Sequence, residues 1–260
     1  MVTNNTLSNI VEYYPDGTPQ TAEWREKGRL HRTDGPAEIR YYPDGTIESE
    51  EWWKDGQWHR TDGPAYISYN PNGSITTEFW LQGWQLHRDD GPARIEYNTD
   101  GTIKREEWYQ NGQHHRTDGP SIIDYFTGDI IKCEEWRLND ELSRTDGPAY
   151  TEYNQNGTIH KKEWYLHGKQ HRENGPAGII YSLDGLIKNE SWWLDGLLHR
   201  ENGPAIIDYR ENGTPLLEQW FQNGKRHRTD APAVIEYGKN RAIEYEQWWQ
   251  NGQQITPPQK

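Results

Sequence analysis

Apolar and polar side chains alternate along short stretches of this chain, and the alternation restarts every 28 residues. In residues 36–63, the type copy, Ala37, Ile39 and Tyr41 alternate with polar neighbours, and this two-residue period predicts a β-strand. A Pro-Asp-Gly turn at 43–45 and a second alternating stretch at 46–54 follow. Each copy is therefore expected to form one β-hairpin, joined to the next copy by a wider connection.

The second strand of the type copy also predicts which side chains share a face. Its alternation places Trp52 with Glu50 on one face and Trp53 with Ile47 on the other. A β-bulge at Glu50–Glu51 would change this phase. Without such a bulge, the two adjacent tryptophans point to opposite faces of the sheet.

One tryptophan keeps its place in nine consecutive copies without a change of register. An arginine recurs at the same interval from Arg32 to Arg228, and a histidine precedes it in every copy except the one with Ser143. Regular spacing of this kind is typical of repeat proteins, whose units stack on one another. The recurrent tryptophans, assigned to the structural core, are Trp24, Trp52, Trp80, Trp108, Trp136, Trp164, Trp192, Trp220 and Trp248.

The period leaves no room for a separate globular domain, so the sequence predicts a single tandem-repeat array over residues 11–253. Residues 1–10 are polar and are expected to form an N-terminal cap, and residues 254–260 a C-terminal tail. Leu, Ile, Val and Phe together number only 40 of 260 residues, and with a net charge of -13 this composition would by itself favour disorder. The 14 tryptophans and 16 tyrosines change that picture, because aromatic side chains bury large areas.

The same composition bears on location and partners. The single cysteine, Cys133, excludes an internal disulfide framework and fits a reducing compartment. The chain starts with no basic and apolar leader and contains no long apolar run, so we expect a cytoplasmic protein without a membrane span. The excess of acidic residues works against direct binding to nucleic acid.

Two architectures fit a 28-residue unit of short strands: an antiparallel array of hairpins, or a parallel β-solenoid with one coil per copy. In the solenoid, equivalent residues stack about 4.8 Å apart, so the recurrent arginines would form a ladder of like charges. In the hairpin array, equivalent residues recur on every second strand, and opposite charges can lie between them. We therefore predict an all-β fold, an elongated, twisted antiparallel sheet of about nine tandem hairpin repeats, with the solenoid as the alternative.

The repeated tyrosines, the paired Asp-Gly or Asn-Gly turns and the step Trp108-Tyr109-Gln110-Asn111-Gly112 resemble MORN-type repeats. The resemblance is strongest to the variant arrays of bacterial antitoxin-like proteins, phages and large DNA viruses, and it covers nearly the whole chain. It implies an elongated hairpin sheet used for binding. The longer unit and the His-Arg-Thr-Asp-Gly-Pro-Ala segment depart from the usual MORN pattern, so the lipid-binding and scaffolding roles of that family are not carried over.

A residue that is the same in every copy serves a need that every copy has, so we assign the recurrent residues to the fold. The arginines are expected to form interstrand ion pairs with recurrent glutamates such as Glu50 and Glu78. The histidines are expected to support the wide connection through hydrogen bonds. Equivalent histidines roughly 9.6 Å apart cannot share a zinc ion, so no metal site and no cofactor is predicted. The sequence also lacks a unique catalytic constellation, which argues against an enzyme.

Positions that differ between copies are the better candidates for function. The residue after the recurrent tryptophan is mostly aromatic, and it forms a second stripe, either a binding surface or the other half of the core. In the third copy Gly83 arrives one residue early and is followed by Trp84. The candidate binding residues are Trp53, Leu81, Trp84, Tyr109, Tyr165, Trp193, Phe221 and Trp249.

These observations favour a non-enzymatic repeat scaffold that binds a protein partner along an aromatic sheet face, as an inhibitor or antitoxin-like protein does. One alternative is an acidic mimic of nucleic acid that blocks a DNA-binding protein. Another is the capture of carbohydrate or a small ligand by the aromatic rows. Open sheet edges at both ends also leave a homodimer as an option.

Overall fold

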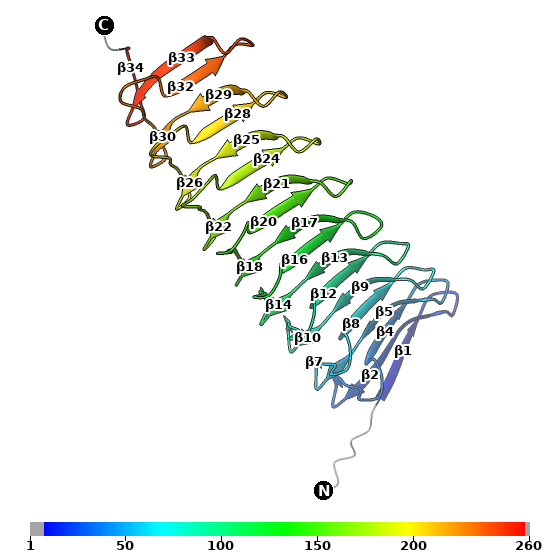
Figure 1. Ribbon diagram of the computed structural model, residues 1–260. Coiled ribbons are helices and arrows are strands. Elements are labelled where there is room, and N and C mark those ends of the chain that lie inside the picture. Colours follow the sequence, from blue (N-terminus) through cyan, green and yellow to red (C-terminus); the bar gives the residue numbers. More distant parts are fainter. Residues whose placement is uncertain (1–7, 258–260) are drawn as a thin grey trace. The chain divides into compact units, whose positions relative to one another are not determined.

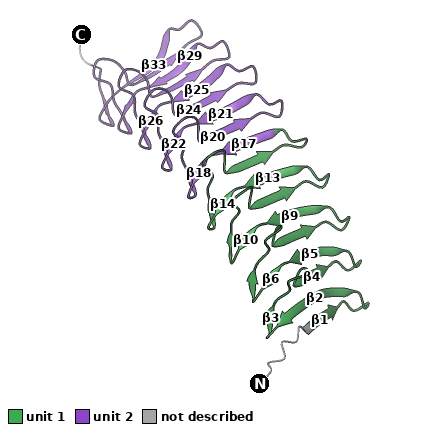
Figure 2. Cartoon of the chain, turned by 60° about the horizontal axis from the view of Figure 1, so that its bottom comes forward, with its two compact units in different colours: residues 1–130 green, residues 131–260 purple. Residues whose placement is uncertain are grey.

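The computed structural model describes residues 8–257 (Figure 1), and in this range the protein contains β-strands and no helix. The strands number 34, and every pairing between them is antiparallel. The prediction of hairpins is thus confirmed, and the parallel solenoid is excluded for these residues. The chain divides into two compact units, residues 1–130 and 131–260 (Figure 2).

In the first unit, strands that follow one another in the chain also lie side by side in the sheet. The main strands are β1 (Ser8–Tyr13), β2 (Pro19–Glu26), β4 (Glu38–Tyr41), β5 (Ile47–Glu51), β8 (Tyr66–Tyr69), β9 (Ile75–Phe79), β12 (Arg94–Tyr97), β13 (Ile103–Glu107) and β16 (Ile122–Tyr125). The short strands are β3 (Arg29–Leu30), β6 (Trp53–Lys54), β7 (Gln57–Trp58), β10 (Leu81–Gln82), β11 (Gln85–Leu86), β14 (Tyr109–Gln110) and β15 (Gln113–His114).

The second unit repeats this arrangement. Its main strands are β17 (Ile131–Glu135), β20 (Tyr150–Tyr153), β21 (Ile159–Glu163), β24 (Gly178–Tyr181), β25 (Ile187–Ser191), β28 (Ile206–Tyr209), β29 (Pro215–Gln219), β32 (Val234–Tyr237) and β33 (Ile243–Gln250). Its short strands are β18 (Arg137–Leu138), β19 (Glu141–Leu142), β22 (Tyr165–Leu166), β23 (Lys169–Gln170), β26 (Trp193–Leu194), β27 (Leu197–Leu198), β30 (Phe221–Gln222), β31 (Lys225–Arg226) and β34 (Gln253–Ile255).

Each full copy contains a long hairpin and a short one, where the sequence predicted a hairpin and a wide connection. In the type copy the long hairpin pairs β4 with β5 and turns at Asp44-Gly45, where the N–H of Tyr42 donates to the carbonyl of Thr46 at 2.8 Å. The short hairpin pairs β6 with β7. Its turn residues Asp55 and Gly56 have φ of 53° and 77°, as a type I′ turn requires.

The cross-strand register defines two faces of each sheet. On the first, which we call the isoleucine face, Ile39 lies opposite Glu50, and Glu50 opposite Ile67. On the second, the variable face, Ser49 lies opposite Ser68, and Glu51 opposite Tyr66. The alternation continues to the end of each return strand, so the recurrent tryptophans belong to the isoleucine face and the residues after them to the variable face.

This assignment confirms the predicted separation of Trp52 from Trp53. The register shift falls between Arg40 and Tyr41, opposite Ser49 and Ile47, and not at Glu50–Glu51. The phase at the two tryptophans is therefore unchanged.

Small buried residues begin each long hairpin and connect neighbouring copies. The N–H of Ala37 donates to the carbonyl of Glu51, and the carbonyl of Ala37 accepts from the N–H of Trp24, both at 2.8 Å. The alanines at this position are at most 1% exposed: Ala37, Ala65, Ala93, Ala149, Ala177, Ala205 and Ala233. Part of the predicted cap, residues 1–7, lies outside the described residues, and so does part of the predicted tail, residues 258–260; Ser8–Ile10 belong to β1.

Candidate binding surface

The recurrent arginine of each copy stacks on the recurrent tryptophan of the same copy. In the type copy the guanidinium carbon of Arg60 lies 4.0 Å from the ring centroid of Trp52. Such cation–π contacts contribute about 0.5–2 kcal/mol, depending on how far the pair is desolvated. Eight pairs have this geometry, at 3.7–4.2 Å: Arg32/Trp24, Arg60/Trp52, Arg88/Trp80, Arg116/Trp108, Arg144/Trp136, Arg172/Trp164, Arg200/Trp192 and Arg228/Trp220.

The same guanidinium also closes the Thr-Asp-Gly-Pro loop that follows it. Arg60 Nε donates to Asp62 at 3.1 Å, and one of its terminal nitrogens donates to the carbonyl of Pro64 at 3.2 Å. A Cβ on Gly63 would lie 2.7 Å from the guanidinium carbon, so glycine lets the guanidinium lie close to the loop backbone. The predicted ion pairs between the arginines and Glu50 or Glu78 are therefore wrong. Arg60 and Arg88 pair instead with the aspartates two residues after them, Asp62 and Asp90.

The recurrent glutamates instead accept hydrogen bonds from tyrosines of the next copy. Tyr69 donates from its hydroxyl to Glu50 at 2.7 Å. The bond recurs at 2.6–2.9 Å in Tyr97/Glu78, Tyr125/Glu106, Tyr153/Glu134, Tyr209/Glu190 and Tyr237/Glu218. Burial raises the pKa of Tyr153 to about 12, and its bond to Glu134 adds to the shift.

The recurrent histidines hold the turn of the next short hairpin. Nδ1 of His171 accepts from the backbone N–H of Asp195 at 3.2 Å. The equivalent bonds, at 3.1–3.2 Å, are Asp55 to His31, Asn111 to His87, Asn223 to His199 and Asn251 to His227. The prediction of hydrogen-bonded histidines is confirmed, and the part of the predicted wide connection that they support is this tight turn.

Ser143, which breaks the histidine row, has the same role as the histidines. Its hydroxyl accepts from the N–H of His167 at 3.2 Å, the position equivalent to Asp195. Among residues 8–257 no group of three or more His, Cys, Asp or Glu side chains is placed to hold a metal ion. The recurrent side chains thus bind one another, and they hold neighbouring copies together.

The candidate binding stripe lies on the variable face and is half-buried throughout, except that Trp84 is 65% exposed. Trp53 and Trp84 are in contact, with ring centroids 5.5 Å apart. The other members occupy the short hairpins of other copies. The backbone carbonyl of the stripe residue accepts from the arginine N–H of the preceding copy, as between Trp193 and Arg172 at 3.1 Å.

Several polar stripe residues bind the side chain two residues earlier in the sequence. The indole N–H of Trp53 donates to Glu51 at 3.0 Å, and that of Trp249 to Gln247 at 3.1 Å. Arginine at the same place does likewise, with Arg25 donating to Glu23 at 2.7 Å. In one copy Ser191 replaces the acceptor two residues before Trp193, and the buried indole nitrogen of Trp193 has no hydrogen-bond partner.

Sequence reasoning missed a second row beside the stripe. The short hairpin places each stripe residue opposite the residue five positions later, as Trp53 opposite Trp58 and Tyr109 opposite His114. The rings of these pairs are 4.3 Å and 4.1 Å apart. The row comprises Leu30, Trp58, Leu86, His114, Leu142, Gln170, Leu198, Arg226 and Gln254.

The variable face also carries charges of both signs that neutralise one another. Arg105 bridges Glu107 at 2.7 Å and Asp124 at 2.8 Å. Burial acts to raise the pKa of Glu107, but hydrogen bonds from His114 and Arg105 lower it to about 2. In the second unit Lys161 pairs with Glu163 at 2.9 Å.

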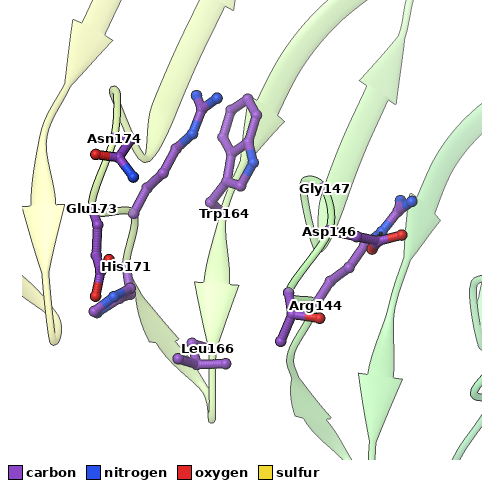
Figure 3. A pocket seen from close by; sticks show the side chains of 10 residues that line it. Arg144, Asp146, Gly147, Trp164, Leu166, His171, Glu173 and Asn174 are labelled. Carbon is purple, nitrogen blue, oxygen red and sulfur yellow. Dashed lines mark hydrogen bonds and ion pairs between the residues drawn. The ribbon is translucent and has the colours of Figure 1, made fainter.

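Between consecutive Arg-Thr-Asp-Gly-type loops the second unit has shallow grooves. One, of about 400 Å³, is lined by Arg144, Asp146, Trp164, His171 and Glu173 among others (Figure 3). Trp164 stands between the loop that carries Asp146 and the loop that carries Glu173 (Figure 3). A groove of about 500 Å³ follows one copy later. Their walls are the recurrent side chains, so they belong to the fold.

No family model and no curated protein matches the sequence, so the resemblance to MORN-type repeats stays a prediction. Solved structures give weak similarities. One, described as "Crystal Structure of TcdB2-TccC3-TEV", is 13% identical with a TM-score of 0.21, over 96% of this chain and 15% of that chain. Another, "Crystal Structure of TcdB2-TccC3", is 11% identical with a TM-score of 0.17, over 90% of this chain and 13% of that one. Neither similarity bears on function. The described residues include no helix able to cross a membrane.

Proposed function

We propose that this chain is a non-enzymatic repeat scaffold that binds a protein partner on its variable face, in the manner of an inhibitor or antitoxin-like protein. The observation that carries the proposal is the asymmetry of the two faces. The recurrent residues of the isoleucine face bind one another, whereas the variable face presents a different set of half-buried side chains in each copy.

The composition of the variable face suits a protein interface. Its stripe and the adjoining row contain tryptophan, tyrosine and arginine, the residues that contribute most at interface centres. Their polar heads are held by neighbours two residues away, as Trp53 is by Glu51. A side chain held in this way loses little conformational freedom on binding, which favours affinity.

An acidic mimic of nucleic acid is less well supported, because the carboxylates of this face are paired with cations. Arg94 binds both Glu96 and Glu107, and Arg105 binds Glu107 and Asp124. The single cysteine fits a reducing, cytoplasmic location, and the MORN resemblance fits a binding role.

The proposal is tested by affinity capture from host lysate at about 50 and 200 mM salt, where screening of exposed charges differs. The wild type is compared with Tyr165→Ala/Trp193→Ala on the variable face and with His171→Ser on the isoleucine face. We expect one stoichiometric protein that survives the higher salt, is retained by His171→Ser and is lost with the double variant.

Two outcomes would contradict this expectation. Capture of DNA-binding proteins that dissociate at the higher salt would support mimicry instead. Equal capture by all three proteins would place the interface elsewhere. Light scattering on the purified chain tests separately whether it forms a homodimer.

A further inference from the structure

The third copy has a short hairpin unlike the others. In the other copies both turn residues have positive φ, and glycine comes second, as in Asp55-Gly56, except in the fifth copy, which has Asn139-Asp140. Between β10 and β11 glycine comes first: Gly83 has a φ of 64°, and Trp84 does not have a positive φ. This is the order of a type II′ turn. The second turn position, elsewhere glycine or, in the fifth copy, Asp140, is thereby able to carry a large side chain without a positive φ.

That position faces the preceding copy. A Cβ on Gly112, the equivalent residue one copy later, would lie 3.5 Å from the side chain of Gln85 in the preceding short hairpin. Trp84 accordingly reaches Trp53, with ring centroids 5.5 Å apart and planes at 69°. Trp53 lies between Trp84 and Trp58, whose ring centroid is 4.3 Å away. Trp84 remains 65% exposed, which is far more than the other stripe residues.

Trp84, Trp53 and Leu30 form the apolar side of an open hollow of about 460 Å³. This volume lies in the range of small-ligand sites, roughly 300–1,000 Å³. The rest of the wall is polar, and it comes from Arg25, Arg29, Asp55 and Gln57.

Two of these polar groups are fixed in place by other residues. Arg25 donates to Glu23 at 2.7 Å and to the carbonyl of Gly28 at 3.0 Å. The backbone of Asp55 is held by its N–H, which donates to Nδ1 of His31 at 3.2 Å. Glu23 balances the charge of Arg25, and Asp55 lies in the same wall as Arg29. The hollow therefore offers oriented donors and acceptors around aromatic rings, with little net charge.

We propose that this hollow binds a neutral oligosaccharide. One sugar ring stacks its C–H face on Trp84, because the face of an aromatic ring is electron-rich and attracts weakly positive hydrogens. Adjacent hydroxyls, each both donor and acceptor, bind Arg25, Asp55 and Gln57. A quaternary ammonium ligand fits less well because two arginines line the site. A purely aliphatic ligand would leave the polar groups of the wall without partners.

Titration of the full chain with neutral oligosaccharides tests the site, followed by tryptophan fluorescence and by calorimetry. The panel consists of glucose, mannose and N-acetylglucosamine oligomers. We expect a saturable change with at least one of them. Trp84→Ala should weaken binding roughly tenfold or more, and it should leave the fold intact because the side chain is largely exposed.

The double variant Gly83→Asp/Trp84→Gly, which restores the turn of the other copies, should lose binding to the same extent. Trp193→Ala, on a short hairpin of the second unit, should bind as the wild type does. The proposal is overturned if no oligomer binds the wild type at about 10 mM, where even very weak sites fill. It is equally overturned if Trp84→Ala binds normally, or if choline binds and the sugars do not. Protein capture through Tyr165 and Trp193 is measured separately, so the two proposals fail independently.

Discussion

The recurrent contacts of the isoleucine face and the stripe contacts of the variable face differ in how far they reach along the chain. On the isoleucine face Tyr153 binds Glu134, 19 residues earlier, and His171 binds the N–H of Asp195, 24 residues later. On the variable face the stripe residue Trp53 binds Glu51, two residues earlier. The tyrosine and histidine contacts join one copy to the next, whereas the stripe contact begins and ends within one copy. The variable face also has contacts between copies, but their residues differ, as Arg105 with Asp124 and Asn189 with Asp208.

This difference explains how a repeat array can change its binding surface without losing its fold. A contact between copies constrains two copies at once, so its residues recur. A contact two residues apart can be exchanged in one copy alone, as when Glu51 with Trp53 becomes Glu107 with Tyr109. The comparison predicts that equal substitutions on the two faces have unequal effects on stability.

The largest difference is expected for Trp108→Ala against Tyr109→Ala, adjacent residues on opposite faces. Trp108 carries the stacked Arg116 at 4.2 Å, so its removal should cost about 3–5 kcal/mol. Tyr109 stacks on His114 within its own hairpin, and its removal should cost less than half as much. Urea unfolding followed by circular dichroism measures both variants. Equal shifts of the unfolding midpoint would mean that the two faces contribute equally to stability.

The alternation of the sequence was enough to predict the hairpin period and the separation of Trp52 from Trp53. It did not predict the partners of the arginines. A two-residue alternation describes strands only, and Asp62 reaches Arg60 through the conformation of a loop. The pairing of Trp53 with Glu51 was present in the sequence, since Glu135 with Arg137 and Glu163 with Tyr165 have the same spacing. The sequence showed that Gly83 comes one residue early. That this glycine forms a different turn, which exposes Trp84, could be seen only from the backbone angles of the structure.

A smaller effect is expected for the contact between the histidine row and the turns. His171→Ala leaves the N–H of Asp195 without its acceptor and should cost about 1 kcal/mol. His171→Ser should recover much of this loss, because Ser143 accepts the equivalent bond in another copy. The same denaturation experiment compares the two variants. If serine were no better than alanine, the hydrogen bond would not be the reason for the recurrence of histidine.

The tyrosine–glutamate bonds give the isoleucine face a dependence on alkaline pH. Because the pKa of Tyr153 is about 12 in the folded protein and 10.0 for an unperturbed tyrosine, its contribution to stability is complete below pH 10 and is lost as the pH rises to 12. Tyr153→Phe should therefore cost about 1 kcal/mol at neutral pH and less at alkaline pH. Unfolding measured at both pH values tests this. A cost that does not change with pH would contradict the assigned role of the hydroxyl.

The smallest effect is expected at the glycine beneath the guanidinium. A Cβ on Gly147 would lie 2.9 Å from the guanidinium carbon of Arg144. The eighth copy has Ala231 at the equivalent place; there Arg228 keeps its stack on Trp220, at 3.8 Å. Within the described residues Arg228 makes no ion pair with Asp230 of its loop, whereas Arg144 binds Asp146 at 2.7 Å.

Gly147→Ala should therefore break the bond to Asp146 and keep the stack on Trp136. Stability should barely change, since an exposed ion pair contributes little. The hydrogen bond from Arg144 holds the pKa of Asp146 below its usual range, so in the variant this pKa should rise. NMR titration of the carboxylate measures the rise, and the reverse change Ala231→Gly should leave stability equally unaffected. A large loss of stability in Gly147→Ala would show that the ion pair, and not the stack, closes the loop.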